Sequence, residues 1–492
     1  MPRLSKSRFV AGWQCPLRLW LQVHHPELAP APDEQQQAIF NTGNQVGELA
    51  QQRYPGGQLI EADHRQIEAA REQTQWLMGQ SEVGALYEPA FQHRDVLTRV
   101  DVLAPSEEGW DLIEVKSSTR AKEVFQVDVA VQYWILVGAG IPVERAGLLV
   151  LNRDYVYPGG PLDLGQLFRF EDLTGDSEAR FDWVTEQVEF LHRVAADDQA
   201  PDIEMGPQCE SPYPCPFLDY CGQGRDFPEH PVTILPGLRG ERLAGLQERG
   251  IESVEAIPDG YPLTGPQERV RQATLQGRPW ESGSLRAELE RVEWPLFYLD
   301  FEAAMMAVPR HPGTRPYDPL PFQFSCHIQR SPGAALEHRE FLATDPEADP
   351  REPLAHALLD VLEERGSIIV YSGYEWRTIQ NLAQAVPTLS ERLIPLGQRL
   401  VDLLAILRNH YYHPAFHGSY SIKQVLPVLA PDMSYDDLEV ADGQAAGRAW
   451  QQMLASKDPV ERKRLERALR VYCHQDSLAM YRLREVLLCE AS

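Results

Sequence analysis

Two acidic residues and a lysine early in the chain have the types and spacing needed to bind a divalent metal ion. Asp101 and Glu114 lie in the segments Leu97–Leu103 and Trp110–Ser117, which the pattern predicts to pair as a β-hairpin. Because side chains alternate along a strand, Glu114 and Lys116 would point to the same face. Carboxylate oxygens suit Mg²⁺ or Mn²⁺. Such an ion polarises a phosphate and generates hydroxide from water, while a lysine stabilises charge.

A simpler explanation of these charges is a set of solvated cross-strand contacts, the usual state of carboxylates and lysines on a hairpin. The segment Asp111–Lys116 argues against that explanation, because Leu112, Ile113 and Val115 are apolar residues typical of a core strand. Charges embedded in such a strand favour a metal site over a solvated surface.

The same two segments resemble a known nuclease signature. Arg99–Leu103 together with Leu112–Ser117 is similar to the RecB-like branch of the PD-(D/E)XK nuclease superfamily. The resemblance implies that Asp101 and Glu114 hold the metal ion and that Lys116 acts in catalysis.

The resemblance extends to two residues outside the hairpin. Gln132, followed by Tyr133, matches that branch's glutamine-containing motif, which contacts substrate or the lysine, although Leu136 stands where a tyrosine is usual. Upstream, Gly43–Glu48 occupies the position of a helix that carries an additional metal ligand. Many relatives have histidine there, and the resemblance assigns that ligand role to Glu48.

The cysteines suggest a second kind of metal centre. Cys209, Cys215 and Cys221 cluster in a short segment, and Cys15 lies at the opposite end of the same predicted domain. In a reducing compartment such a cluster indicates metal ligation sooner than disulfides. Four thiolates can hold either a tetrahedral Zn²⁺ ion or an iron–sulfur cluster.

The arrangement of one cysteine plus three resembles CRISPR-associated RecB-like exonucleases and related helicase-nucleases. In those proteins a [4Fe–4S] cluster joins the N-terminal segment to the end of the nuclease domain, which implies a structural [4Fe–4S] cluster here. Both spacings in this chain are five residues, unlike the tighter pair of the relatives, and this difference keeps Zn²⁺ as the alternative. The other three cysteines are predicted to be ordinary buried thiols: Cys326, Cys473 and Cys489.

A second set of acidic residues lies in the C-terminal half. Asp300 and Glu302 occupy alternate positions of a predicted strand, and Tyr472 and Asp476 share one face of a predicted helix. Each pattern alone is commonly a surface feature. Their order within one α/β unit resembles the DEDD exonucleases of the RNase H-like fold. That resemblance implies two divalent ions held by these acids and a tyrosine that orients the attacking water.

The remaining acid of this set is predicted from the segment after the strand Ser367–Ser372. The family usually has asparagine and then aspartate where this chain has Ser372 and Glu375. Glu375 is therefore the preferred fourth ligand, and Asp402 is the reserve or an additional acid.

Two interpretations are open for His413, His417 and Lys423. These side chains could contact substrate phosphates, or they could belong to a structured loop in which Ser421 is the N-cap of a helix.

An α/β architecture is needed to position these groups. Residues 1–230 would form a PD-(D/E)XK restriction-endonuclease-like core with the cysteine cluster. Besides the hairpin, the expected helices of this core are Ser7–Val23, Gln35–Arg53, Gln66–Gly79 and a helix that begins at about Lys122. Ala146–Asn152 is expected to be a strand. Residues 231–290 would form a helix-hairpin-helix-like module that grips a DNA backbone, or a small helical linker.

Residues 291–492 would form the second α/β unit, an RNase H-like domain. Its expected strands are Leu296–Glu302, Pro321–Gln329 and Ser367–Ser372. Its expected helices are Leu354–Glu364, Glu375–Ala385, Leu403–His410 and Arg462–Cys489.

Composition limits the possible classes of protein. With 492 residues the chain is too long for one ordinary core, and 43% hydrophobic residues are typical of a globular protein. The net charge of −26 implies that any nucleic acid would be bound by local basic grooves. Met1–Lys6 has no apolar run after its basic residues, so no signal peptide is expected. No charge-free apolar stretch is long enough to cross a bilayer, and the predicted location is the cytoplasm.

Together these features predict a metal-dependent nuclease with exonuclease activity, which acts on single-stranded DNA or on DNA with free ends in repair, recombination or defence. An RNA exonuclease and a nucleic-acid-binding scaffold with one active site are the alternatives. The chain has no P-loop, so any unwinding would come from a separate helicase partner. The stretch Gly313–Phe324 also resembles a bacterial family of unknown function that pairs a RecB-like domain with an RNase H-like domain.

Overall fold

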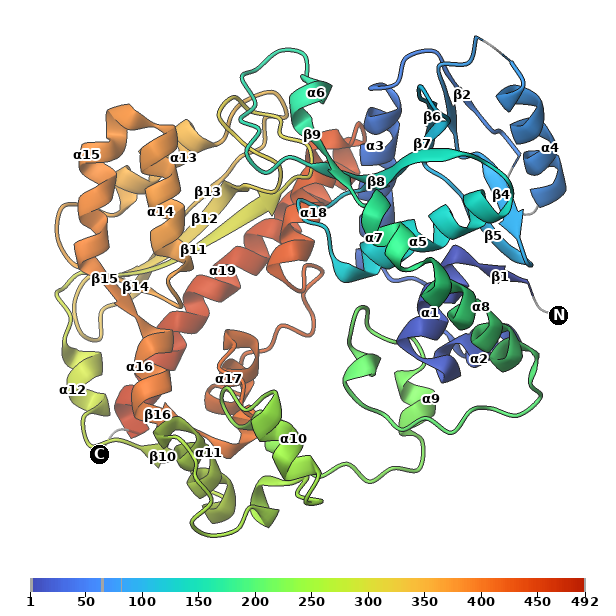
Figure 1. The fold of residues 1–492 in the computed structure, drawn as a ribbon. Coiled ribbons are helices and arrows are strands. Elements are labelled where there is room, and N and C mark those ends of the chain that lie inside the picture. The colour runs from blue at the N-terminus through green and yellow to red at the C-terminus, as the bar shows by residue number, and fades with distance from the viewer. Residues whose placement is uncertain (1–2, 63–65, 81, 491–492) are drawn as a thin grey trace. The chain divides into compact units, whose positions relative to one another are not determined.

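The computed structural model describes residues 3–62, 66–80 and 82–490 and shows a mixed α/β protein, as predicted (Figure 1). Met1 and Pro2, part of the segment used to predict the absence of a signal peptide, lie outside the described residues. The chain divides into two compact units. Unit 1 comprises Met1–Arg225 and Met306–Asp318, and unit 2 comprises Asp226–Met305 and Pro319–Ser492. The predicted module at 231–290 is thus grouped with unit 2.

Unit 1 is built on a six-stranded mixed sheet with the strand order β2-β3-β6-β7-β8-β9. Its strands are Gly57–Leu59 (β2), Ala85–Tyr87 (β3), Val102–Pro105 (β6), Trp110–Lys116 (β7), Val143–Leu151 (β8) and Phe168–Asp172 (β9). The β6–β7 pair is antiparallel and β7–β8 is parallel. A second sheet joins Leu4–Ser5 (β1), Val96–Arg99 (β5) and Ala90–His93 (β4).

The predicted strand Leu97–Leu103 was wrong as a single element. The chain leaves β5 after Arg99, bends at Asp101 and begins β6 at Val102, in a different sheet. Val100 stays fully buried through this crossing, so the apolar alternation continues although the strand does not. Asp101 therefore lies at a bend between two sheets. Because it is not part of a strand, the alternation of side chains between the two faces of a sheet does not fix the direction of its carboxyl group.

The helix after the hairpin, Glu123–Gly138 (α5), is buried along almost its whole length. Its buried residues are apolar except for Asp128, Gln132 and the half-polar Tyr133 and Trp134. Asp128 and Gln132 are four residues apart, so they share one face of the helix. Two polar side chains on an otherwise apolar helix need polar partners, and they find them in the site described below.

The predicted helix Ser7–Val23 is two helices, Lys6–Gln14 (α1) and Pro16–His24 (α2). The break is at Cys15, which is extended with φ −159° and ψ 118°. Proline disfavours helical backbone at the residue before it, and Pro16 itself suits the first turn of a helix. This local rule turns the chain at Cys15 and sets that thiol between the two helices.

Unit 1 contains six further α-helices among the described residues. They are Glu34–Gln51 (α3), Ile67–Met78 (α4), Leu164–Leu167 (α6), Thr174–Ala179 (α7), Phe181–Ala196 (α8) and Leu218–Gly222 (α9). The segment Met306–Asp318 adds Ala307, Val308 and Tyr317 to a core cluster of this unit.

Unit 2 contains a five-stranded mixed sheet with the order β13-β12-β11-β14-β15. Its strands are Leu296–Met305 (β11), Pro319–Gln329 (β12), Leu336–Leu342 (β13), Ser367–Val370 (β14) and Leu400–Asp402 (β15). The first three strands pair antiparallel, whereas β11–β14 and β14–β15 are parallel.

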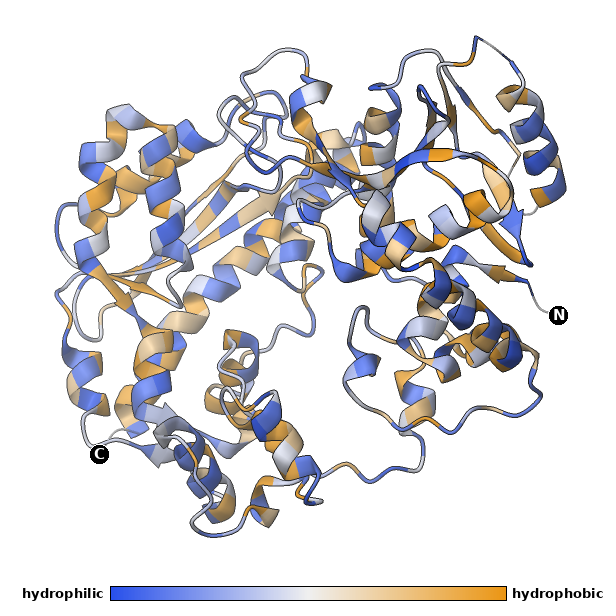
Figure 2. Ribbon diagram, in the orientation of Figure 1, coloured by the Kyte–Doolittle hydropathy of each residue, from blue (hydrophilic) through white to orange (hydrophobic). Residues whose placement is uncertain are grey.

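The two faces of this sheet differ in polarity. Phe297, Leu299 and Phe301 of β11 pack in a core cluster with residues of the helices Arg351–Val361 (α13) and Tyr374–Ala385 (α14). Figure 2 shows α14 with alternating hydrophobic and hydrophilic stretches, as expected of a helix that covers a sheet. The opposite face of the two central strands carries Tyr298, Asp300, Glu302, Gln323, Ser325 and His327.

The polar face lies along Pro459–Glu490 (α19), the long helix drawn in red in Figure 1. Gln323 donates a hydrogen bond to the Leu469 carbonyl (3.0 Å), and the hydroxyls of Ser325 and Ser477 are 2.7 Å apart. This contact of a polar strand face with a helix is the setting of the second site.

The other elements of unit 2 are helices and short strands. They are Glu241–Gln247 (α10), Gly265–Gln276 (α11), Trp280–Glu281 (β10), Leu285–Glu290 (α12), Ser390–Leu393 (α15), Leu403–His410 (α16), Tyr411–Tyr412 (β16), Ile422–Leu429 (α17) and Gly443–Ala455 (α18). In the described part of the chain, no helix combines the length and the hydropathy needed to cross a bilayer.

Candidate functional site

The acidic pair of unit 1 is held together by a main-chain hydrogen bond. Oδ2 of Asp101 accepts a hydrogen bond from the Val115 amide at 2.6 Å, between Glu114 and Lys116. Glu114 lies on β7 and is only 2% exposed. The bend at Asp101 thus brings its carboxyl group to the strand that carries the other predicted acid and the lysine.

Two lysines neutralise the buried Glu114. Lys116 Nζ lies 2.7 Å from Glu114 Oε1 and 2.7 Å from Asp128 Oδ2. Lys6 Nζ lies 2.7 Å from the same Glu114 oxygen and 3.7 Å from Asp128 Oδ2. Lys6 is the first residue of α1, and the parallel pairing of β1 with β5 (Ser5 opposite Leu97) places it there.

Gln132 completes the surroundings of Glu114. Its Nε2 donates to Glu114 Oε2 at 2.8 Å. Both oxygens of that carboxylate therefore accept hydrogen bonds, Oε1 from the two lysines and Oε2 from Gln132. Gln132 is fully buried, and within the described chain its Oε1 has no hydrogen-bond partner. A buried amide oxygen without a partner is costly, and a substrate group, a water or a hydrated ion could satisfy it.

The two carboxyl groups of this site differ in their electrostatics. Burial and the charge of Glu114 raise the pKa of Asp101 to about 8. Burial alone would raise the pKa of Glu114, but Lys116 and Lys6 outweigh it and lower that pKa well below its usual range. The site therefore holds one firmly ionised carboxylate and one carboxyl group that retains a proton near neutral pH.

The structure does not bring Glu48 to this pair by any hydrogen bond or ion pair found among the described residues. Glu48 is exposed on α3. Glu88, which forms an ion pair with Arg99 at 3.3 Å, also raises the pKa of Asp101, but less than burial and Glu114 do. The metal-ligand role of Glu48 stays a prediction.

All four predicted cysteine ligands line one small pocket of unit 1. Cys15 comes from the α1–α2 break, and Cys209, Cys215 and Cys221 come from the segment before the end of the unit. Their thiols form no disulfide. Arg18 lies close enough to Cys15 and Cys215 to be influenced by their charges, so it would stabilise thiolates.

The segment with the three cysteines is tied to the N-terminal helices by one glutamine. Gln14 Nε2 donates to the carbonyls of Gln208 (2.7 Å) and Tyr213 (2.6 Å). Cys15 follows Gln14 directly, so these bonds bring the two ends of the predicted ligand set together. Burial raises the pKa of the Cys215 and Cys221 thiols, a cost that a bound metal centre would offset.

The acids of unit 2 converge on the polar face of its sheet. Ligating atoms of Asp300, Glu302 and Cys473 all lie within 4.8 Å of one another. Asp300 and Glu302 lie on β11, and Cys473, on α19, is 3.8 Å from Asp300 Oδ2 through its sulfur. Cys473 is buried, as predicted, but it is not an ordinary core thiol because it contacts a site carboxyl. Cys326 is buried as predicted, whereas Cys489 is exposed, so its prediction was wrong.

Asp476 joins the same cluster from the next turn of α19. It accepts a hydrogen bond from the Tyr435 hydroxyl at 2.5 Å, and the Tyr472 hydroxyl is a second hydrogen-bond partner. Lys423 Nζ lies 5.2 Å from the centre of the Tyr472 ring and 5.6 Å from that of Tyr435. Lys423 is the nearby cation that acts on Glu302 and Asp476.

Glu375 reaches the cluster from the start of α14. It is 3% exposed, and its charge is one of those that raise the pKa of Asp300. The Ser372 hydroxyl donates to Glu375 Oε2 at 3.5 Å. Asp402 acts on Glu375 electrostatically, but its own side chain accepts a hydrogen bond from the Ala405 amide as the N-cap of α16. Asp402 is thus beside the cluster in a capping role.

Burial and mutual repulsion raise the pKa values of the unit 2 acids. The pKa of Asp300 and of Glu302 is raised well above the usual range, that of Glu375 to about 8 and that of Asp476 to about 6. For Asp300 the causes are burial first and then the charges of Asp476, Glu302 and Glu375. Three buried acids and the half-buried Asp300, with Lys423 nearby, form a site in which added positive charge would be strongly favourable.

Sequence reasoning missed Lys6, Asp128, Glu88 and Tyr435. Asp128 had a detectable signal, since it lies four residues before Gln132 in an apolar helix. Lys6 and Tyr435 lie far from their partners in sequence and had none. Of the loop residues with two interpretations, Lys423 donates a hydrogen bond to the Ala441 carbonyl, and its charge acts on Glu302 and Asp476. His413 Nδ1 accepts a hydrogen bond from the Ala415 amide.

His417 and Ser421 belong to the structured loop. The His417 ring stacks on that of His230, with centroids 5.5 Å apart. Ser421 is at the N-cap position of α17, as predicted, although its side chain makes no capping hydrogen bond.

Part of the chain, most of it in unit 2, matches the model of a protein family. Residues 297–421 match the family model described as Domain of unknown function (DUF2779). The matched range includes the β11 acids and Glu375 but ends before Tyr472 and Asp476. No curated protein matches the chain.

Proposed function

We propose that this protein is a divalent-metal-dependent nuclease that hydrolyses phosphodiester bonds in DNA, with one site in each unit. The observation that carries the proposal is the hydrogen bond from the Val115 amide to Asp101. This bond draws a carboxyl group from a bend to the strand that presents Glu114 and Lys116. Two acids and a lysine around one strand end form a hard-oxygen site with a cation beside it.

In unit 1 the proposed fold is the RecB-like branch of PD-(D/E)XK nucleases. The central β6–β7 hairpin, followed by α5 and the parallel strand β8, supports this assignment. Asp101 and Glu114 would hold Mg²⁺ or Mn²⁺, Lys116 would stabilise charge on the phosphate, and Gln132 would orient Glu114. At both sites the ion, when bound, would polarise the phosphate and lower the pKa of attacking water.

In unit 2 the proposed fold is RNase H-like, and the proposed activity is removal of nucleotides from a strand end. The acids on the central strand β11, with Asp476 on α19 and Glu375 on α14, support a DEDD-type site. Tyr472 would orient the attacking water from its place beside Asp476. Lys423, whose charge acts on Glu302 and Asp476, would approach a substrate phosphate.

The four cysteines would hold a [4Fe–4S] cluster with a structural role. Their common pocket and free thiols support a bound metal centre, and the order of one cysteine followed by three along the chain favours the iron–sulfur cluster over Zn²⁺. Tyr213, between Cys209 and Cys215 in sequence, is influenced by the charges of Lys116 and Asp128. The cluster would therefore help to shape the unit 1 site without taking part in hydrolysis.

Hydrolysis of labelled nucleic acids by the full-length protein tests the proposal. Single- and double-stranded DNA, circular DNA and matched RNA are incubated with Mg²⁺, Mn²⁺ or chelator. Asp101→Asn, Asp300→Asn and the double variant are compared with wild type. Each single variant should lose one activity by on the order of 10²-fold or more, and the double variant should lose both, because a metal ion contributes several kcal/mol.

Two matched controls separate loss of a site from general damage. Asp111→Asn removes a buried aspartate of the same strand β7 that pairs with Arg145 outside the site. Asp432→Asn removes a surface ion pair of unit 2 with Arg482. Activity that survives chelation, or full activity in the double variant, would overturn the proposal. Cleavage of RNA alone would reassign the substrate, and binding without cleavage would indicate a scaffold.

A further inference from the structure

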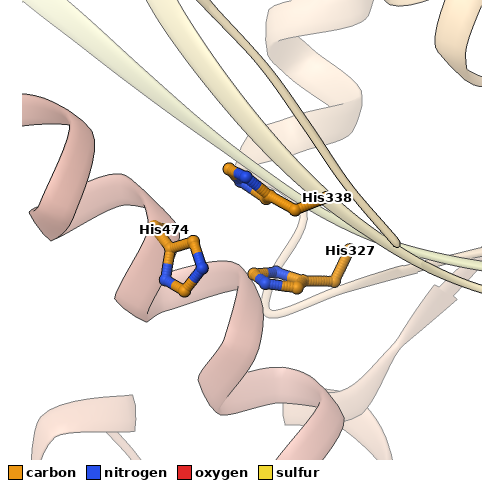
Figure 3. Close-up of side chains that lie close together, drawn as sticks. All are labelled: His327, His338 and His474. Atoms are coloured by element: carbon orange, nitrogen blue, oxygen red, sulfur yellow. The ribbon is translucent and has the colours of Figure 1, made fainter. Parts of the chain in front are cut away.

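Three histidines from separate elements of unit 2 meet outside the acidic site. His327 lies on β12, His338 on β13 and His474 on α19, as Figure 3 shows. His327 and His338 are directly opposite each other in the antiparallel ladder. The three ring centroids are 4.6 to 4.7 Å apart. One ring nitrogen from each residue belongs to a set of atoms that all lie within 4.8 Å of one another.

Neighbouring serines hold two of these rings in place. The Ser325 hydroxyl lies 2.9 Å from His338 Nε2, and the Ser477 hydroxyl lies 2.8 Å from His327 Nδ1. The two hydroxyls are themselves 2.7 Å apart. A hydrogen bond to one ring nitrogen that fixes the orientation of an imidazole is the usual support of histidine metal ligands.

The three rings differ in their exposure to solvent. His327 is 3% exposed, while the other two rings are half-buried, so an ion has access from the side of His338 and His474. Within the described chain, the ring of His474 makes no hydrogen bond, although it packs against both other rings.

We propose that His327, His338 and His474 bind one Zn²⁺ ion through three imidazole nitrogens and leave a fourth position for water or another ligand. Three nitrogen donors without a carboxylate select Zn²⁺ over Mg²⁺, because imidazole suits zinc and oxygen donors suit magnesium. A small adjustment of the rings is needed, since nitrogens at about 2.1 Å from one ion are about 3.4 Å apart in a tetrahedral site.

The ion would join α19 to the two strands β12 and β13. His474 faces these strands, whereas its neighbour Cys473 contacts Asp300. Zinc binding would therefore hold in register the helix that carries Tyr472 and Asp476, without supplying a ligand to the acidic site. The inference does not depend on the proposed nuclease activity.

Zinc content and a cobalt spectrum of the full-length protein test this site. With excess Mg²⁺ present, wild type should retain one more Zn²⁺ ion per chain than His338→Gln or His474→Gln, by elemental analysis after dialysis. His356→Gln removes an exposed histidine of α13 and serves as the matched control that retains the ion. Asp300→Asn should also retain it, which separates this result from loss of the nuclease site.

Cobalt distinguishes the histidine site from the cysteine pocket. Co²⁺ bound by nitrogen alone gives visible bands without the near-ultraviolet charge-transfer band of a thiolate complex. Wild type should show such a nitrogen-only component, and Ser325→Ala should weaken Co²⁺ binding by about 10- to 100-fold through loss of ring orientation.

Two results would overturn the inference. One is equal zinc content in wild type and both histidine variants, measured where their circular dichroism spectra coincide. The other is the absence of a nitrogen-only Co²⁺ component in wild type, a result that depends on no variant folding correctly.

Discussion

Lys6 and Glu114 form a hydrogen-bonded ion pair across 108 positions of sequence, with Nζ 2.7 Å from Oε1. The pair exists because β1 adds to β5 in parallel and the first turn of α1 begins directly after it. Lys116 Nζ is also 2.7 Å from the same oxygen. Lys6 therefore brings a second ammonium group to Glu114, a proposed metal ligand, and its removal should change the stability of unit 1.

Replacement of Lys6 by methionine should destabilise unit 1 by about 1.5–3 kcal/mol, because it removes a charged partner from a buried carboxylate. The measurement is urea unfolding in chelator. Lys122→Met is the control, since Lys122 lies over the Phe125 ring at 5.6 Å and has no part in the site. A double-mutant cycle with Glu114→Gln should give a coupling of at least about 1 kcal/mol. Equal stability of wild type and Lys6→Met would contradict the importance of the pair.

Binding of Mg²⁺ should strengthen as pH rises toward about 8. The pKa of Asp101 and that of Glu375 are each raised to about 8, chiefly by burial, so near pH 6 both groups hold a proton that the ion must displace. Each displaced proton makes the affinity rise roughly tenfold per pH unit below the raised pKa. Isothermal titration in two buffers of different ionisation enthalpy would show proton release. An affinity that is constant between pH 6 and pH 8 would disagree with the raised pKa values.

The same raised pKa values make the stability of the metal-free protein fall as pH rises, whereas the affinity for Mg²⁺ increases. A carboxyl group whose folded pKa is raised binds more protons in the folded state than in the unfolded state. The metal-free protein should therefore lose stability as pH rises from about 5 toward 8, and Mg²⁺ should reduce that loss. Thermal unfolding with and without chelator measures both effects, and Asp101→Asn should flatten the pH dependence in chelator.

Loss of one cluster cysteine should remove iron and destabilise unit 1 before it changes the chemistry of unit 2. Cys215→Ser, purified anaerobically, should lack the broad visible absorption expected of the wild-type protein and should melt at a lower temperature. Cys489→Ser is the control, because Cys489 is exposed and lies in unit 2. A colourless wild-type protein that contains zinc bound by sulfur would instead establish the zinc alternative.

Removal of the Tyr472 hydroxyl should slow the Asp300-dependent activity without unfolding unit 2. Tyr472→Phe keeps the ring and removes one hydrogen-bond partner of Asp476, whose other partner is Tyr435. We expect kcat to fall by about 10- to 100-fold with little change in KM, because a group that orients water acts mainly in the transition state. Tyr435→Phe, which leaves Tyr472 in place, is the comparison. An equal loss in both variants would mean that the tyrosines only support Asp476.

The secondary structure was predictable where local rules are strong. The hairpin strand β7, the helix α5 and the helix α19 follow from alternation and helical periodicity in apolar segments. Two local features were misread. The helix predicted through Ser7–Val23 ignored Pro16, which ends the first helix before Cys15. The strand predicted through Leu97–Leu103 followed the apolar alternation, which continues at the buried Val100 although the chain passes from one sheet to another at Asp101.

The candidate sites divide in the same way. The sequence alone determined that Glu114, Asp300 and Glu302 are acids within core strands and that Gln132 interrupts an apolar helix, because burial patterns repeat over two to four residues. Only the tertiary structure decided that Lys6 reaches Glu114, that Cys473 contacts Asp300 and that His327 faces His338 and His474. Those contacts depend on strand register and on helix packing between distant segments, which no local periodicity encodes.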